Sequence, residues 1–294
     1  MNYQEFLSEI QNTLRTQIAP EVQLIIQSMP RNNGVSYDGL ILLSPGCNIS
    51  PTIYLTPYYH RYLDGVNMED ICTDILMTYR NHLPQENFDT TRFTSFEKVR
   101  SRLVMRLVNY ERNRNQLSDV PHVRFCDLAI IFYCLLHADT DNQANILVHN
   151  SHLNLWGIDK DTLYMLAREN TPALLPPEIT PMHTILERLH CPDPDLFSES
   201  IPMYVISNCY RTNGAGVILY DQFLQQLSDR FESNLILLPS SIHEMIILPV
   251  EDNSELREFT YMVREVNDTQ LTDDEVLSDH AYYYDRAKQK LIME

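Results

Sequence analysis

The stretch 235–250, LILLPSSIHEMIILPV, constrains the fold more than any other part of this 294-residue chain. It contains two apolar runs of strand length, and within each run the apolar residues are consecutive rather than alternating. A strand of this composition needs cover on both faces. We therefore predict that 235–238 and 245–248 pair as central strands, and that helices at 222–231 and 253–267 cover them.

The polar connection between these strands brings two hydroxyls, an imidazole and a carboxylate close together. Ser241, His243 and Glu244 are the candidate catalytic residues, and Ser240 is a candidate binding residue. A zinc-protease motif would need a second histidine where the chain has Ile247. Two interpretations remain: a serine–histidine nucleophilic site, or side chains that satisfy the backbone of a tight turn. We favour the turn, because neighbours in sequence seldom face each other productively.

The remaining apolar patterns predict alternating strands and helices. Strands are expected at 22–29, 40–43, 51–55, 125–136, 144–148, 203–207, 215–220 and 279–284, and helices at 2–19, 67–82, 95–116, 159–170 and 182–189. A unit of strand, turn, strand and helix recurs near 38–80, 125–170, 203–231 and 235–267. Such repeated strand-strand-helix units favour an α+β fold, with antiparallel or mixed sheets and helices packed on them.

Proline content suggests where the chain divides. Seven of the sixteen prolines lie between 171 and 202. Proline interrupts helices and central strands, so this segment is the predicted boundary. We expect an N-terminal α+β lobe at 1–175, a proline-rich connection with a short helix at 176–202, and a C-terminal α+β lobe at 203–294.

Basic residues gather between 92 and 114, where seven Lys and Arg face two Glu. On the helix predicted at 95–116, Lys98, Arg102 and Arg106 recur every four residues. Arg102 and Arg106 are therefore candidate binding residues for a phosphate or nucleotide. The alternative is a surface that pairs with acidic residues of the same chain, such as those at 251–275, and the overall charge favours this alternative.

The net charge of -18 argues against non-specific binding to nucleic acid or to an anionic membrane. No stretch approaches the roughly 18 consecutive apolar residues of a membrane span, so we expect a cytoplasmic protein. The six cysteines form no CxxC pair and predict free thiols in a reducing compartment. With seven glycines and no GxGxxG or GxxxxGK[ST] motif, phosphate-binding loops of the dinucleotide or P-loop kind are excluded, and no cofactor is expected.

Two further groups of polar residues contain side chains that could form a site. His149 and His152 lie near Asp139 and Asp141, but a loop with scattered polar residues gives little support for a metal, and none is expected. The segment 278–280 contains serine, aspartate and histidine, yet in an extended chain the aspartate points away from the other two. We interpret this as coincidence.

Five segments resemble one known family in their order and spacing: SPTIYL, LVNYERN, LPSSIHEMIILP, REVNDTQ and LSDHAYYYD. The family is the uncharacterised bacterial family named domain of unknown function 5688, and the resemblance covers nearly the whole chain. It has no assigned activity. The resemblance therefore implies a cytosolic bacterial protein and supplies no catalytic residues.

Together these observations favour a non-catalytic binding or protein-interaction protein with an acidic surface, whose partner is an unknown protein or small ligand. The alternative is a hydrolase or transferase with its site at the 239–244 connection. Geometry separates the two hypotheses. An enzyme requires the side chains of that connection to converge with a perturbed imidazole, whereas a binding protein allows them to bond only to local backbone.

Overall fold

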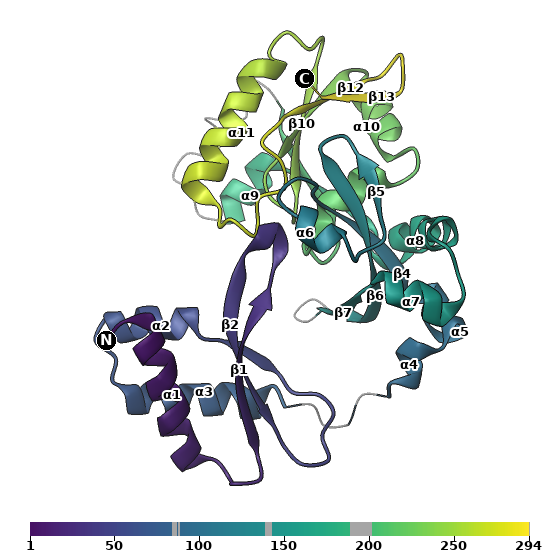
Figure 1. Ribbon diagram of the computed structural model, residues 1–294. Coiled ribbons are helices and arrows are strands. Elements are labelled where there is room, and N and C mark those ends of the chain that lie inside the picture. The colour runs from purple at the N-terminus through teal and green to yellow at the C-terminus, as the bar shows by residue number, and fades with distance from the viewer. Residues whose placement is uncertain (84–86, 88, 139–142, 189–201, 294) are drawn as a thin grey trace. The chain divides into compact units, whose positions relative to one another are not determined.

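The computed structural model describes residues 1–83, 87, 89–138, 143–188 and 202–293. Its contacts divide the chain into two compact units, whose elements are labelled in Figure 1. The first unit contains Met1–Arg31 and Val35–Thr90, and the second contains Asn32–Gly34 and Thr91–Glu294.

The first unit is a three-stranded antiparallel sheet, in the order β1-β2-β3, with its helices packed against one face (Figure 1). Its elements are α1 (Tyr3–Gln17), β1 (Gln23–Pro30), β2 (Ser36–Leu43), β3 (Thr52–Tyr54), α2 (Thr56–Leu63) and α3 (Met68–Asn81). Core side chains alternate with partly exposed ones, as Leu40 and Leu42 of β2 alternate with Ile41 and Leu43. Among the described residues of this unit, no helix covers the other face of the sheet.

The second unit contains a four-stranded and a six-stranded antiparallel sheet. Its N-terminal part comprises η1 (Asn32–Gly34), α4 (Thr91–Thr94), α5 (Phe96–Val99), η2 (Arg100–Arg102), β4 (Leu103–Asn109), α6 (Arg114–Leu117), β5 (His122–Phe125), β6 (Leu128–Ala138), β7 (Gln143–Leu147), α7 (Asn150–Trp156) and α8 (Lys160–Leu174). Its C-terminal part comprises β8 (Pro177–Pro181), α9 (Met182–Arg188), β9 (Tyr204–Asn208), η4 (Gly214–Leu219), α10 (Phe223–Phe231), β10 (Asn234–Pro239), β11 (Met245–Val250), α11 (Leu256–Gln270), β12 (Tyr282–Asp285) and β13 (Lys290–Met293).

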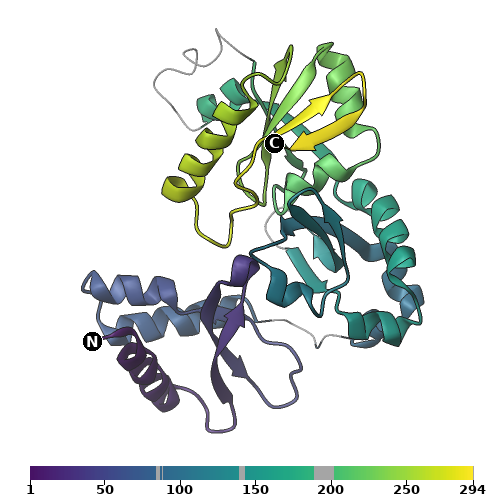
Figure 2. The ribbon, with the colours of Figure 1, turned by 45° about the horizontal axis from the view of Figure 1, so that its top comes forward.

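The predicted central strands are confirmed as β10 and β11, which pair antiparallel from Asn234↔Val250 to Pro239↔Met245. Successive residues of β10 point to opposite sides. Leu235 and Leu237 pack in a core with α10, whereas Ile236 and Leu238 pack in a core with α11. Figure 2 shows the two helices on opposite faces of the sheet. Consecutive apolar residues are needed here because both faces are buried.

The predicted helix at 95–116 is wrong, because its centre is the strand β4, which pairs with β6 from Leu103↔Cys134 to Asn109↔Leu128. The strand directs Leu103 and Leu107 into one core and Val104 and Val108 into another. A spacing of four residues is close to the 3.6-residue period of a helix, and it also equals two periods of a strand, whose side chains return to the same face every two residues. The pattern that suggested a helix is therefore equally a strand pattern.

The strand predicted at 215–220 is also wrong, because Gly214–Leu219 forms the 3₁₀ helix η4. The preceding strand, β9, is already paired on both edges, with β11 and β8, so no edge is left for a hairpin partner. The segment instead packs tightly. A Cβ built on Gly214 would lie 2.0 Å from Oγ of Ser207, so only glycine fits at its start.

The α+β prediction is confirmed, since every strand pair in the three sheets of the described chain is antiparallel and helices cover the sheets. The compact units differ from the predicted lobes. Strand β8 pairs with β9 across the proline-rich segment, from Pro177↔Asn208 to Pro181↔Tyr204. One core also joins Leu103 and Phe132 to Leu237. Residues before and after 176–202 therefore share a sheet and a core.

Limited proteolysis tests the proposed boundary. We expect the first cut between 171 and 202, because seven of the sixteen prolines lie there and proline disfavours long helices and central strands. Because β8 and β9 pair across it, we expect the two fragments to co-elute in size-exclusion chromatography and to separate only in denaturant. Fragments that separate under native conditions, or a first cut elsewhere, would contradict this expectation.

Burial of β11 predicts a large effect of a single substitution in the six-stranded sheet. Ile247 is fully buried, and Ile247→Ala should lower the free energy of unfolding by about 2–5 kcal/mol through lost burial and a cavity. Met165, which is 64% exposed on α8, is the matched control. Met165→Ala should change the free energy of unfolding by less than about 0.5 kcal/mol. Equal urea midpoints for the two variants would refute the two-sided burial of β11.

Candidate functional site

The connection between β10 and β11 is a tight turn held by its own backbone. The amides of Ser240 and Ser241 both donate to the carbonyl oxygen of Glu244, at 3.3 Å. The amide of Ile242 donates to the carbonyl of Glu275 at 2.9 Å, which ties the turn to the segment after α11. The candidate residues are thus fixed in position by the two central strands.

The hydroxyls of this turn bond locally. The Ser241 Oγ atom accepts from the backbone N–H of His243 at 3.0 Å, and the Ser240 hydroxyl lies 3.4 Å from Oε1 of Glu244. Within the described residues, neither hydroxyl bonds to the His243 ring. The first contact is an ordinary serine turn, in which a side chain satisfies a nearby amide.

The His243 imidazole is held by a second loop. Its Nδ1 atom accepts from the backbone N–H of Asn213 at 3.1 Å, so the neutral ring carries its proton on Nε2. That atom lies 4.0 Å from Oε1 of Glu275. Burial lowers the pKa of His243 below its usual value, while the carboxylates of Glu275 and Glu244 oppose the shift and Arg106 reinforces it. The ring is therefore neutral near pH 7, and it is oriented toward a carboxylate.

The loop that meets His243 contains residues that sequence reasoning did not select. Arg211 and Asn213 both adopt left-handed backbone conformations, with φ of 52° and 51°. Arg211 also pairs with Glu178 of β8 at 3.0 Å, which lowers the pKa of that carboxyl by a hydrogen bond. Residues 211–214, RTNG, have the composition of a turn, but the contact of this turn with His243 depends on the sheet.

The candidate binding residues Arg102 and Arg106 do not form one basic face. Arg102 ends η2 and donates to the carbonyl oxygens of Arg92 and Lys98, at 2.8 and 3.0 Å. Arg106 lies on β4, with its Cζ atom 3.3 Å from the centroid of the Tyr133 ring. The two arginines therefore do not lie on one helix as predicted. Arg102 bonds to backbone carbonyls at a turn, and Arg106 stacks on the Tyr133 ring.

A buried polar network includes Ser278 of the serine-aspartate-histidine segment. Its hydroxyl donates to Asp127 at 2.7 Å, and Tyr282 donates to the other oxygen of the same carboxylate at 2.6 Å. Burial raises the pKa of Tyr282 well above its usual value, and the negative charge of Asp127 adds to the shift. Asp279 instead accepts from Arg112 at 3.0 Å. The network fastens β12 to the turn between β5 and β6.

The two histidines weighed as metal ligands form a helix cap. Nδ1 of His149 lies 2.9 Å from Asp119, and Nδ1 of His152 accepts from the amide of His149 at 2.9 Å. Asp139 and Asp141 lie outside the described residues. In the described part of the chain, no three His, Cys, Asp or Glu side chains gather as a metal site would require.

The model of a family of unknown function (DUF5688) matches residues 3–286. The chain belongs to this family. The match spans both compact units and includes the connection between β10 and β11. No curated protein and no solved structure matches the chain. Among the described residues, no helix combines the length and the apolar character needed to cross a membrane.

The lowered pKa of His243 predicts a pH dependence of stability. Above pH 6.5 the ring is neutral in both the folded and the unfolded chain; below it, the unfolded chain binds a proton more readily, so stability falls as pH decreases. His243→Asn keeps an acceptor for the Asn213 amide and removes the titration. We expect urea midpoints of this variant to fall less between pH 7 and pH 5 than those of the native protein.

A second histidine also contributes to this measurement. The pKa of His152 is also lowered by burial, so a residual slope is expected in His243→Asn. An unchanged slope in His243→Asn would contradict a buried neutral imidazole.

Proposed function

We propose that the protein is a non-catalytic interaction protein that binds a basic segment of another protein through its acidic surface. The observation that carries the proposal is the outer side of α11, where Tyr261, Met262 and Val266 are 56%, 50% and 38% exposed. Large apolar side chains grouped on the exposed side of a helix mark contact surfaces.

The charge around these residues defines the partner. Nine acidic and two basic residues lie between 251 and 275. Glu258 precedes Met262 by one helical turn, and Glu265 follows Tyr261 by one turn, so carboxylates flank the apolar side chains. Within the described residues, neither glutamate belongs to an ion pair. A partner with Lys or Arg beside apolar side chains complements this surface.

The hydrolase or transferase alternative has less support. Activation of a serine nucleophile needs a hydroxyl that donates to an imidazole nitrogen. Here Ser241 accepts from a backbone amide, and Nδ1 of His243 is occupied by another amide. These local bonds match the arrangement expected of a binding protein. The enzyme alternative is supported by the His243 ring, whose Nε2 atom lies 4.0 Å from a carboxylate oxygen of Glu275.

The bacterial cytoplasm is the proposed location. Cys72 and Cys134 are buried free thiols, and burial raises the pKa of Cys72 to about 11. A buried thiol of this kind is stable in a reducing compartment. Cys191 lies outside the described residues.

A synthetic amphipathic peptide of alternating Lys and Leu clusters tests the interaction surface. We expect it to bind the full chain, as followed by fluorescence anisotropy, and to be released as salt rises from about 0.1 to about 0.5 M. The double variant Tyr261→Ser/Met262→Ser should bind at least about tenfold more weakly. Met165 of α8 is also an exposed methionine, at 64%, and the matched control Met165→Ser should not change binding.

A second peptide, in which every Lys is replaced by Glu, supplies the outcome that would overturn the proposal. Equal binding of the two peptides would mean that the acidic surface does not choose the partner. Undiminished binding of the Lys peptide by the double variant would place the contact away from α11. Turnover of ester or phosphoester substrates that is lost in His243→Asn would favour the enzyme.

A further inference from the structure

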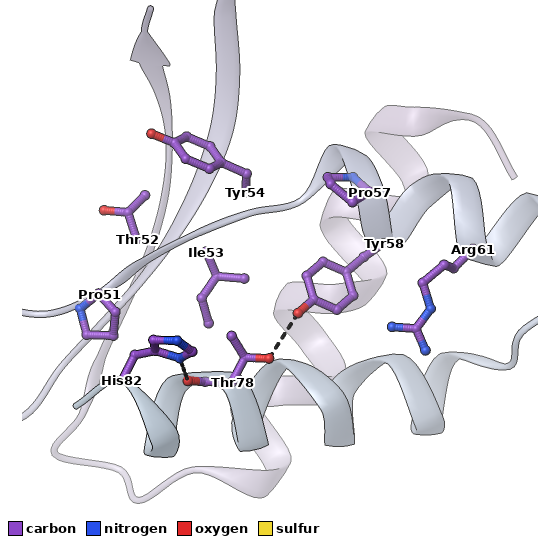
Figure 3. A pocket seen from close by; sticks show the side chains of 9 residues that line it. All are labelled: Pro51, Thr52, Ile53, Tyr54, Pro57, Tyr58, Arg61, Thr78 and His82. Atoms are coloured by element: carbon purple, nitrogen blue, oxygen red, sulfur yellow. Dashed lines mark hydrogen bonds between the residues drawn. The ribbon is translucent and has the colours of Figure 1, made fainter. Parts of the chain in front are cut away.

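A groove runs along the outer edge of β3 in the first unit. It has a volume of about 520 Å³ and is lined by Pro51, Thr52, Ile53, Tyr54, Pro57, Tyr58, Arg61, Thr78 and His82. Figure 3 shows α3 running beside the strand, with Ile53, Tyr58 and Thr78 between them. The volume lies within the usual range for ligand sites, about 300–1,000 Å³.

The strand beside the groove is an edge strand, because β3 pairs only with β2 in the order β1-β2-β3. The amide of Leu55 donates to the carbonyl of Asp38 at 2.9 Å, so the backbone groups of Leu55 point toward β2. In an antiparallel pair every second residue points its N–H and C=O toward the partner strand, so those of Ile53 also point toward β2. The N–H and C=O groups of Thr52 and Tyr54 therefore point outward, and no backbone group among the described residues bonds to them.

The floor and the walls of the groove are fixed by internal contacts. Ile53 is 6% exposed and forms part of the floor. The hydroxyls of Tyr58 and Thr78 lie 3.2 Å apart and join α2 to α3. Nδ1 of His82 donates to the carbonyl of Thr78 at 2.8 Å (Figure 3). The groove is thus preformed, which lowers the cost of ordering it when a ligand binds.

Charge distinguishes this groove from the rest of the acidic chain. No carboxylate occurs among its nine described lining residues, which include Arg61 and His82. Nη2 of Arg61 bonds to Asp74 at 2.5 Å, and the Arg61 side chain as a whole is 43% exposed. A guanidinium has five N–H donors, so one bond to Asp74 leaves others to receive a carboxylate.

We propose that this groove binds an extended peptide segment of a partner protein, which adds as a strand to β3 and places an acidic side chain at Arg61. The outward groups of Thr52 and Tyr54 bond to the peptide backbone. An apolar peptide side chain packs over Ile53 and Tyr58. Backbone pairing gives affinity, and the groove gives specificity. The site is independent of the acidic surface on α11.

Selection from a phage-displayed library of random peptides of about ten residues, long enough to span the groove, tests the proposal on the full chain. We expect the enriched peptides to share one Asp or Glu and a neighbouring apolar position. A synthetic enriched peptide should bind at least about tenfold more weakly to Arg61→Gln, which removes the charge and keeps a donor for Asp74. Enrichment of basic peptides, or of none, would overturn the proposal.

A pair of substitutions at Thr52 separates backbone pairing from other contacts. Thr52→Pro removes the outward N–H at the first position of an edge strand, where proline is tolerated. Thr52→Val keeps that N–H and the shape of the side chain. We expect only the proline variant to lose binding by about tenfold or more. Equal affinities of the two variants, both folded by circular dichroism, would refute strand addition.

Amide hydrogen exchange measured by NMR gives a readout that needs no variant. If Thr52→Pro unfolds the first unit, the native protein still answers the question. The bound peptide should slow exchange of the Thr52 and Tyr54 amides and leave that of Ile53, which already faces β2, nearly unchanged. Unchanged exchange at Thr52 and Tyr54 at saturating peptide would overturn the proposal.

Discussion

Two-sided burial of β10 and β11 is the constraint on which the second unit depends. Every position of β10 from Leu235 to Leu238 is buried, with alternate side chains in two different cores. One of these cores also contains the inner side chains of β4 and β6. The four-stranded and six-stranded sheets are therefore joined through the same residues that form the central strands. A cavity on either face of the β10–β11 pair would therefore weaken a core that also contains side chains of other elements.

The polar turn between these strands follows from the same constraint. Buried strands leave a short connection whose amides need partners. Ser241, Glu244 and the carbonyl of Glu275 supply them. His243 then accepts from the backbone N–H of Asn213, a partly buried residue with a left-handed backbone conformation. The residues that resemble a catalytic set in the sequence are, in the fold, largely occupied with satisfying backbone.

The two proposed contact surfaces lie where a helix or a strand is covered on one side only. Helix α11 covers the sheet with Val263 and Leu256 and exposes Tyr261 and Met262 on its other side. Strand β3 pairs on one edge and leaves the other beside a groove. The first is acidic, and the described residues that line the second include an arginine and no carboxylate. A chain of strong net negative charge can therefore offer two chemically distinct contacts.

The sequence by itself determined the local elements whose pattern had one interpretation. Consecutive apolar residues at 235–238 and 245–248 required buried strands with helices on both sides, and the α+β class followed from the hairpins. It could not separate helix from strand at 103–109, because a spacing of four satisfies both periods. Tertiary structure decided that Arg106 stacks on Tyr133, that Asn213 meets His243, and that β3 stays at an edge. These contacts join residues far apart in the chain, and only the pairing of strands brings them together.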